Sequence, residues 1–385
     1  MSNEMKKYWE AALQKIADQD ISPIMPAVDL SIQGADKFPL ANLSTLGVAF
    51  QPLTSAIQTA LTGSGGSGLY FVNTYGKQMF SSTGGFIGSL QTAGGAVGGG
   101  QARMIPLACD PTMLFMAAAL MNVEKKLDDI RKTQEEILEF LESKERASLQ
   151  GNLNTLEDVL SNFKYNWNSD TYKTNKHILV QDIKKDSEAS IILYRDQIAQ
   201  QMQRRSRIHS DQEVHGILKK LGTRLQDYQL ALYLYSYSSF LEVLLLGNFT
   251  QPYLESVEKR ISDYTLQYRE LYTSCYNLLE EYSKSSIQAG VMSGLASAGK
   301  LLGKAVSKVP VISNSQLDET LLAAGNQLEK HGDRQAERTL KGLTQNKENV
   351  TLPFVENLRK IDQLYNHPVA YLIDGESMYI KQLES

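Results

Sequence analysis

The most regular pattern of apolar positions lies between residues 113 and 141. Apolar residues recur there in alternating steps of three and four, directly after Asp110 and Pro111, which suit the cap and first turn of a helix. Opposite charges four residues apart fill the positions between them. The pattern predicts one long helix over roughly 111–149, ended by Gly151. Its seam for another helix comprises Leu120, Leu127, Ile130, Ile137 and Leu141.

Weaker helical patterns follow along the rest of the chain, and the first twenty residues also read as an amphipathic helix. Such a set predicts a mainly α fold, an elongated antiparallel bundle of long, coiled-coil-like helices. The aromatic residues between Tyr228 and Phe240 fit the core or an interface of that bundle. The further helices are expected at 152–163, 177–205, 211–246, 252–284 and 317–343.

Alternating patterns typical of strands are few, so the β structure is expected to be minor and peripheral. Residues 22–32 and 69–75 are candidate strands, and 370–380 reads as a hairpin around Asp374 and Gly375.

Charge divides the chain into zones. Between Phe38 and Ala102 only Lys77 is charged, and Gly, Ser, Thr and Ala are abundant. The expected regions are therefore an uncharged N-terminal region (1–102), a helical bundle (103–284), a basic Gly/Ala-rich segment (285–310) and a C-terminal helix with a hairpin (311–385).

The segment 83–100 has no charge and is rich in glycine, with Gly84 and Gly88, and Gly94 and Gly98, each four residues apart. Each glycine costs a water-exposed helix about 0.5–1 kcal/mol relative to alanine, so a soluble helix is a poor interpretation. One hypothesis is a conformational switch that enters lipid or a subunit interface, where close-packing glycines are tolerated. The alternative is a loop or wrap buried against the bundle.

A second candidate membrane segment spans 286–310. Leu295 and Leu302 lie on an apolar stripe, while Lys300, Lys304 and Lys308 recur every four residues on another face. An apolar face, a lysine face and small residues suit an interfacial helix that associates with copies of itself on anionic lipid. The alternative is an amphipathic helix packed on the bundle. The small residues of this segment include Gly290 and Gly294.

The sequence shows few of the motifs expected of an enzyme. Residues 63–68, GSGGSG, match a dinucleotide-binding pattern, but a helical stretch precedes them and a strand follows, which reverses the order that such a site needs. The five histidines show no metal-ligand spacing. The net charge of −4 disfavours nucleic acid as a partner, and the cluster at Arg204–Arg207 suits a helix C-terminus. We therefore expect no catalytic residues, cofactor or metal.

Long helices joined to uncharged Gly/Ala-rich segments resemble the layout of bacterial α-helical pore-forming proteins, although no residue motif identifies a family. Here the Gly-rich segment precedes the longest predicted helix instead of joining two long helices. The first hypothesis is a non-enzymatic bundle protein that engages membranes and oligomerises, with pore formation as one form of that activity. The alternative is a soluble coiled-coil interaction or scaffold protein that binds a helical partner. No apolar core of a Sec-type signal is visible, so a cytoplasmic protein that meets a membrane on activation is expected.

Overall fold

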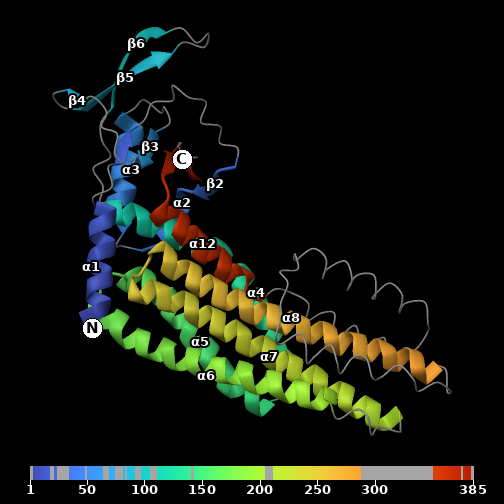
Figure 1. Ribbon diagram of the computed structural model, residues 1–385. Coiled ribbons are helices and arrows are strands. Elements are labelled where there is room, and N and C mark those ends of the chain that lie inside the picture. The colour runs from blue at the N-terminus through green and yellow to red at the C-terminus, as the bar shows by residue number, and fades with distance from the viewer. Residues whose placement is uncertain are drawn as a thin grey trace.

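The computed structural model, shown in Figure 1, consists of long helices that lie side by side, with β structure at one end of them. It describes residues 3–17, 21–23, 34–47, 50–63, 69–73, 81–82, 85–91, 97–104, 111–139, 143–203, 211–287, 350–373 and 376–382.

The helical bundle confirms the predicted mainly α fold. The connections between α5 and α6 and between α7 and α8 are short, so neighbouring helices run antiparallel. α6, α7 and α8 lie side by side along the long dimension of the molecule (Figure 1). The bundle helices are α4 (Pro111–Glu139), α5 (Ser143–Asn166), α6 (Asp170–Gln203), α7 (Asp211–Leu246), α8 (Gln251–Ile287) and α12 (Leu352–Asn366).

The predicted helix over 111–149 is wrong in its length. α4 ends at Glu139 and α5 begins at Ser143, so the heptad pattern runs through a helix boundary. Gly151 does not end a helix but lies inside α5, and the helix predicted at 152–163 is the second part of that same helix. A glycine costs a helix only about 1 kcal/mol, which burial of neighbouring residues readily offsets.

The other helices follow the sequence more closely. α7 has the predicted bounds. α6 begins seven residues before the predicted start and ends two residues before the predicted end, whereas α8 extends beyond the prediction at both ends. α12 was not among the predicted helices, and the predicted helix 317–343 lies outside the described residues.

The first half of α4 and much of α7 are buried on every side, and not along one seam. In α4, residues 112–123 are buried or nearly so, because α1, α5, α7 and α12 all pack around this helix. A helix that is apolar all round belongs in the centre of a protein. The aromatic residues of α7 are buried there, as predicted; they are Tyr228, Tyr233, Tyr235, Tyr237 and Phe240.

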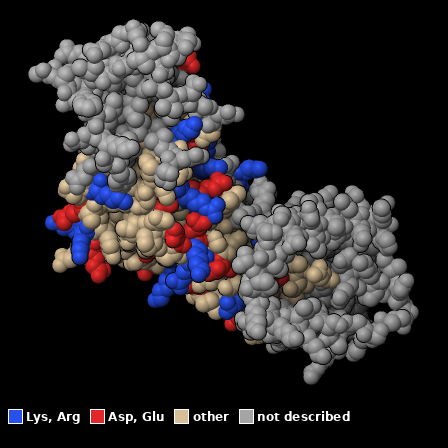
Figure 2. All heavy atoms as spheres, turned by 45° about the horizontal axis from the view of Figure 1, so that its top comes forward, with Lys and Arg blue, Asp and Glu red and all other residues tan. Residues whose placement is uncertain are grey.

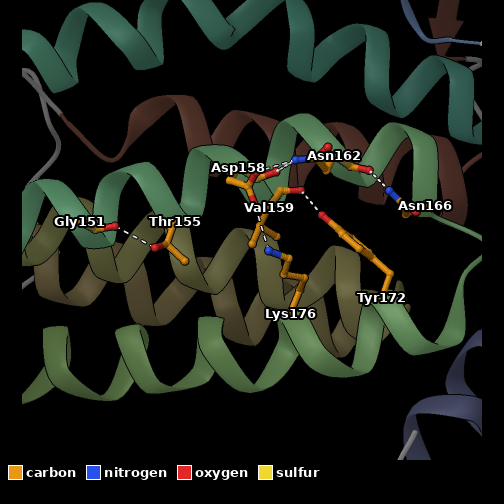
Figure 3. A network of polar contacts seen from close by, with 8 residues as sticks. All are labelled: Gly151, Thr155, Asp158, Val159, Asn162, Asn166, Tyr172 and Lys176. Carbon is orange, nitrogen blue, oxygen red and sulfur yellow. Dashed lines mark hydrogen bonds and ion pairs between the residues drawn. The ribbon is translucent and has the colours of Figure 1, made fainter.

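The polar contacts between α5 and α6 show how antiparallel neighbours are held (Figure 3). The Tyr172 hydroxyl of α6 donates to the Val159 carbonyl of α5 over 2.9 Å, and Lys176 pairs with Asp158 at 2.9 Å. On α5, Asn162 also donates to Asp158 one turn earlier. These exposed contacts fix the register of the two helices more than they stabilise them.

The N-terminal region begins with the predicted amphipathic helix. α1 (Asn3–Ala17) buries Met5, Trp9, Ala12 and Ile16 against the bundle. The short α2 (Ala41–Thr45) and α3 (Gln51–Gly63) follow, and α3 confirms the helical stretch expected before residues 63–68.

A five-stranded sheet joins the two ends of the chain. The predicted C-terminal hairpin, β7 (Val369–Ile373) with β8 (Ser377–Gln382), occupies its middle. Strands from the N-terminal region flank the hairpin on both sides in the antiparallel order β1-β3-β7-β8-β2. These strands are β1 (Ile21–Pro23), β2 (Asp36–Pro39) and β3 (Leu69–Asn73).

A second sheet includes most of the uncharged segment, and this corrects the expectation of a loop or a helix there. The segment pairs as β4 (Ser81–Ser82), β5 (Gly85–Gln91) and β6 (Val97–Met104), all antiparallel. In Figure 1 this sheet extends beyond the end of the bundle, on the far side from α6 and α8. Apolar residues alternate only partly along these strands, and glycine has a low strand propensity, so the sequence pattern gave no clear strand signal.

Candidate functional site

The structure places two of the four singled-out glycines of the uncharged segment in strands. Gly88 lies in β5, opposite Ala102, and Gly98 lies in β6. Gly84 and Gly94 lie outside the described residues. So do all the singled-out residues of the second membrane segment, namely Gly290, Gly294, Leu295, Lys300, Leu302, Lys304 and Lys308.

The pairing of β5 with β6 defines two faces of this strand pair. Phe86 pairs with Met104 and Gly88 with Ala102, so these positions belong to one face, which carries only apolar residue types and glycine. Ile87 pairs with Arg103 and Ser89 with Gln101, so these positions belong to the opposite face, which includes one charged residue. The strand pair therefore has one apolar set of positions and one more polar set.

The residues of the predicted seam meet different outcomes. Leu120 and Ile130 are almost fully buried, so they pack within the chain and need no second protein. Leu127 and Ile137 belong to α4, but their side chains lie outside the described part, as does Leu141 altogether. The Ile130 carbonyl also accepts a hydrogen bond from the Tyr233 hydroxyl over 3.1 Å.

A buried polar cluster between α6 and α7 centres on Glu242. Its carboxylate accepts hydrogen bonds from Lys184 and, over 3.3 Å, from Gln181. The Nε2 atom of His177 lies 3.9 Å from the same carboxylate and has no hydrogen-bond partner. A buried charge is stable only when paired, so the cluster fixes how α6 docks on α7.

The sequence held a signal for this cluster that its spacing alone did not reveal. Glu242 is the only charged residue between Tyr228 and Leu246, a stretch that is otherwise apolar or neutral. A lone carboxylate in such a run implies a buried partner, but only the packing of α6 on α7 shows which cation supplies it.

Burial lowers the pKa of His177 below its ordinary value of 6.5, and nearby Lys184 lowers that pKa further, while Glu242 opposes both. The unfolded chain therefore binds this proton more readily than the folded chain does. Unfolding takes up a proton in the range below pH 6.5, so acid favours the unfolded state.

We expect His177→Gln to reduce the loss of thermal stability that wild type shows between about pH 7.5 and about pH 5.5. The measurement is the unfolding midpoint at the two pH values. Equal losses in wild type and His177→Gln would contradict the assignment.

An open cavity of about 530 Å³ lies where α4, α12 and the five-stranded sheet meet. Its walls carry both signs of charge, and most of these groups are already paired. Lys126 lies 2.7 Å from Glu356, Lys360 pairs with Asp36, and Arg359 binds Glu258 outside the cavity. Compensated charges of this kind join α12 to its neighbours and leave little net attraction for an anionic ligand.

The described residues contain no cluster of three or more metal-ligating side chains. One described helix, Lys220–Leu246 within α7, is long and apolar enough to cross a membrane, but 94% of its apolar window is buried, as expected of a core helix. On the face drawn in Figure 2, basic and acidic side chains intermingle over the described surface.

Comparison with known proteins gives no relative for this chain. No protein-family model, no curated protein and no solved structure matches it.

Proposed function

We propose that this protein is a non-enzymatic helical-bundle protein that engages membranes through the apolar face of its strand pair, β5 with β6, and oligomerises there. One observation carries the proposal. A stretch of 25 residues without charge, 78–102, contributes most of a separate sheet, and that sheet extends away from the helical core.

The pairing of the strands supports this role. A membrane demands that backbone hydrogen bonds be made within the inserted element, and a strand pair already makes part of them. The apolar face at Phe86, Gly88, Ala102 and Met104 supplies a surface that lipid would cover. Assembly with further copies would pair the remaining strand edges and supply the oligomer.

The alternative of a soluble scaffold protein with an open coiled-coil seam is less well supported. Leu120 and Ile130 of the seam are buried inside the chain, so this part of α4 has no free apolar face for a partner helix. The vesicle experiment distinguishes this alternative, because a scaffold protein would show no affinity for lipid.

Vesicle flotation and dye leakage test the proposal. Phe86→Asp with Met104→Asp puts two charges on the apolar face of the strand pair, at partner positions. We expect this variant to lose vesicle binding and leakage, because a charged carboxylate on the lipid-facing side of the strand pair resists transfer into lipid.

The matched control adds the same two charges to the same strands on the other face, as Ser89→Asp with Gln101→Asp, also at partner positions. It should retain vesicle binding. A wild-type protein that neither floats nor leaks, or two variants that bind equally, would refute membrane engagement by this strand pair. Loss of binding only after Lys300, Lys304 and Lys308 are all changed to Glu would assign the membrane contact to 286–310 instead.

A further inference from the structure

The outer face of α6 carries an unusual share of the exposed apolar surface. Among the described residues, seven large apolar side chains are exposed, and four of them lie on this helix. They form two Ile-Leu pairs, Ile178 with Leu179 and Ile192 with Leu193, with exposed fractions between 43% and 55%. Single exposed apolar residues are ordinary, but a repeated pair on one helix points to a contact surface.

The two pairs lie on one stripe of the helix. They are fourteen residues apart, which is about four helical turns or roughly 21 Å along the axis. The opposite face of α6 buries Val180, Ile183, Ile191 and Ile198 against the bundle. In Figure 1 α6 forms an outer edge of the bundle, so the stripe faces outward.

The stripe is partly self-complementary: apolar pairs stand at both ends and opposite charges at its centre, while Asp182 would face Ala189. The exposed sequence along it reads Ile-Leu, Asp182, Lys185-Asp186, Ala189, Ile-Leu. A two-fold axis between 185 and 186 exchanges each Ile-Leu pair with the other and exchanges Lys185 with Asp186. Such self-complementarity is what an isologous contact between identical chains requires.

The charges favour one orientation of a second copy. An antiparallel copy brings Lys185 of each chain to Asp186 of the other, whereas a parallel copy in register brings like charges together. Neither side chain has an ion-pair partner within the described part of the chain, and both are exposed. A second copy would therefore provide the opposite charges that these side chains lack in the monomer.

We infer that a second copy of this chain docks antiparallel along the outer face of α6, around a two-fold axis between Lys185 and Asp186. The contact places Ile178 and Leu179 of each chain against Leu193 and Ile192 of the other. This dimer forms in solution and does not involve the strand pair β5–β6. It can therefore be tested independently of membrane engagement.

Sedimentation velocity over a concentration series, in buffer without lipid, tests this inference through a charge-swap cycle. Wild type should show a concentration-dependent dimer. Lys185→Asp alone or Asp186→Lys alone should weaken the dimer about tenfold, because each creates two like-charge contacts in place of two ion pairs. The double variant K185D/D186K should restore wild-type dimerisation, since the opposite charges face each other again.

An apolar pair of variants completes the test. Leu179→Asp should abolish the dimer, while Leu352→Asp, which changes an exposed leucine of α12 in the same way, should leave it intact. Both should keep the wild-type unfolding midpoint, because both positions are exposed. A wild type that stays monomeric, a dimer that survives Leu179→Asp, or a charge swap that fails to restore dimerisation would overturn the inference.

Discussion

Replacing Trp9 by alanine is expected to lower the free energy of unfolding by about 3–5 kcal/mol, the range for the loss of a large buried aromatic side chain. Trp9 is almost fully buried where α1 crosses the turn between α7 and α8. Its ring meets Phe249 edge-on at 5.7 Å, and the ammonium of the buried Lys173 lies 4.0 Å from its ring centroid.

The indole also closes the end of α7. Its Nε1 donates to the Leu245 carbonyl over 2.8 Å, one of the carbonyls that a helix leaves without an intrahelical partner. Gly247 completes the turn with a φ of +72°, and a Cβ there would come within 2.6 Å of the Trp9 ring. The glycine is required both by its left-handed backbone and by the close approach of the ring.

Urea unfolding measures the effect, with m-values compared so that a change in stability is separated from a change in compactness. Trp9→Phe should lose less, about 1–3 kcal/mol, because it retains a ring but leaves the Leu245 carbonyl without its donor. Tyr8→Ala is the control on the exposed side of α1 and should change stability by less than about 0.5 kcal/mol. Equal effects at Trp9 and Tyr8 would show that α1 is not packed as described.

Replacing Phe354 by alanine is likewise expected to lower the free energy of unfolding by about 3–5 kcal/mol. Phe354 is fully buried in α12 and stacks on Tyr237 with ring centroids 4.9 Å apart. It also meets Tyr233 edge-on at 5.3 Å, so it anchors the C-terminal helix in the aromatic core of α7.

The same urea titration tests this anchor. Phe354→Leu keeps much of the apolar volume and should cost clearly less than alanine. Leu352→Ala, at an exposed position in the same helix, should have little effect. If Phe354→Ala unfolds with the wild-type midpoint, α12 does not belong to the bundle core.

Local patterns in the sequence determined much of the fold. The amphipathic pattern of residues 3–17 was enough to predict α1, and the apolar run that ends at Leu246 gave α7 with its observed bounds. Residues 370–380 gave the C-terminal hairpin through a turn signal between two alternating runs. In each case, the information lies in residues close together in the chain, where helix and hairpin periodicities are set.

Tertiary structure alone decided what lies between distant parts of the chain. The structure has two helices where the sequence predicted one: α4 ends at Glu139 and α5 begins at Ser143, although the apolar pattern continues to Leu141. Glu242 is a lone carboxylate in an apolar helix, and its partners come from α6. Lys184, for example, lies 58 residues before it in the chain.

The sheets show the same division. A local pattern predicted the hairpin β7–β8, but its neighbours β3 and β2 come from the opposite end of the chain. The lack of charge in 83–100 was evident from the sequence, but its pairing into β5 and β6 was not. Glycine has a low strand propensity, so the side chains of such a strand give little signal, and its formation depends on backbone hydrogen bonds to the neighbouring strand. The sequence by itself thus determined where charge, most helices and turns fall. Tertiary structure decided which strands pair and which residue neutralises a buried charge, because these depend on contacts between residues far apart in the chain, which no local pattern records.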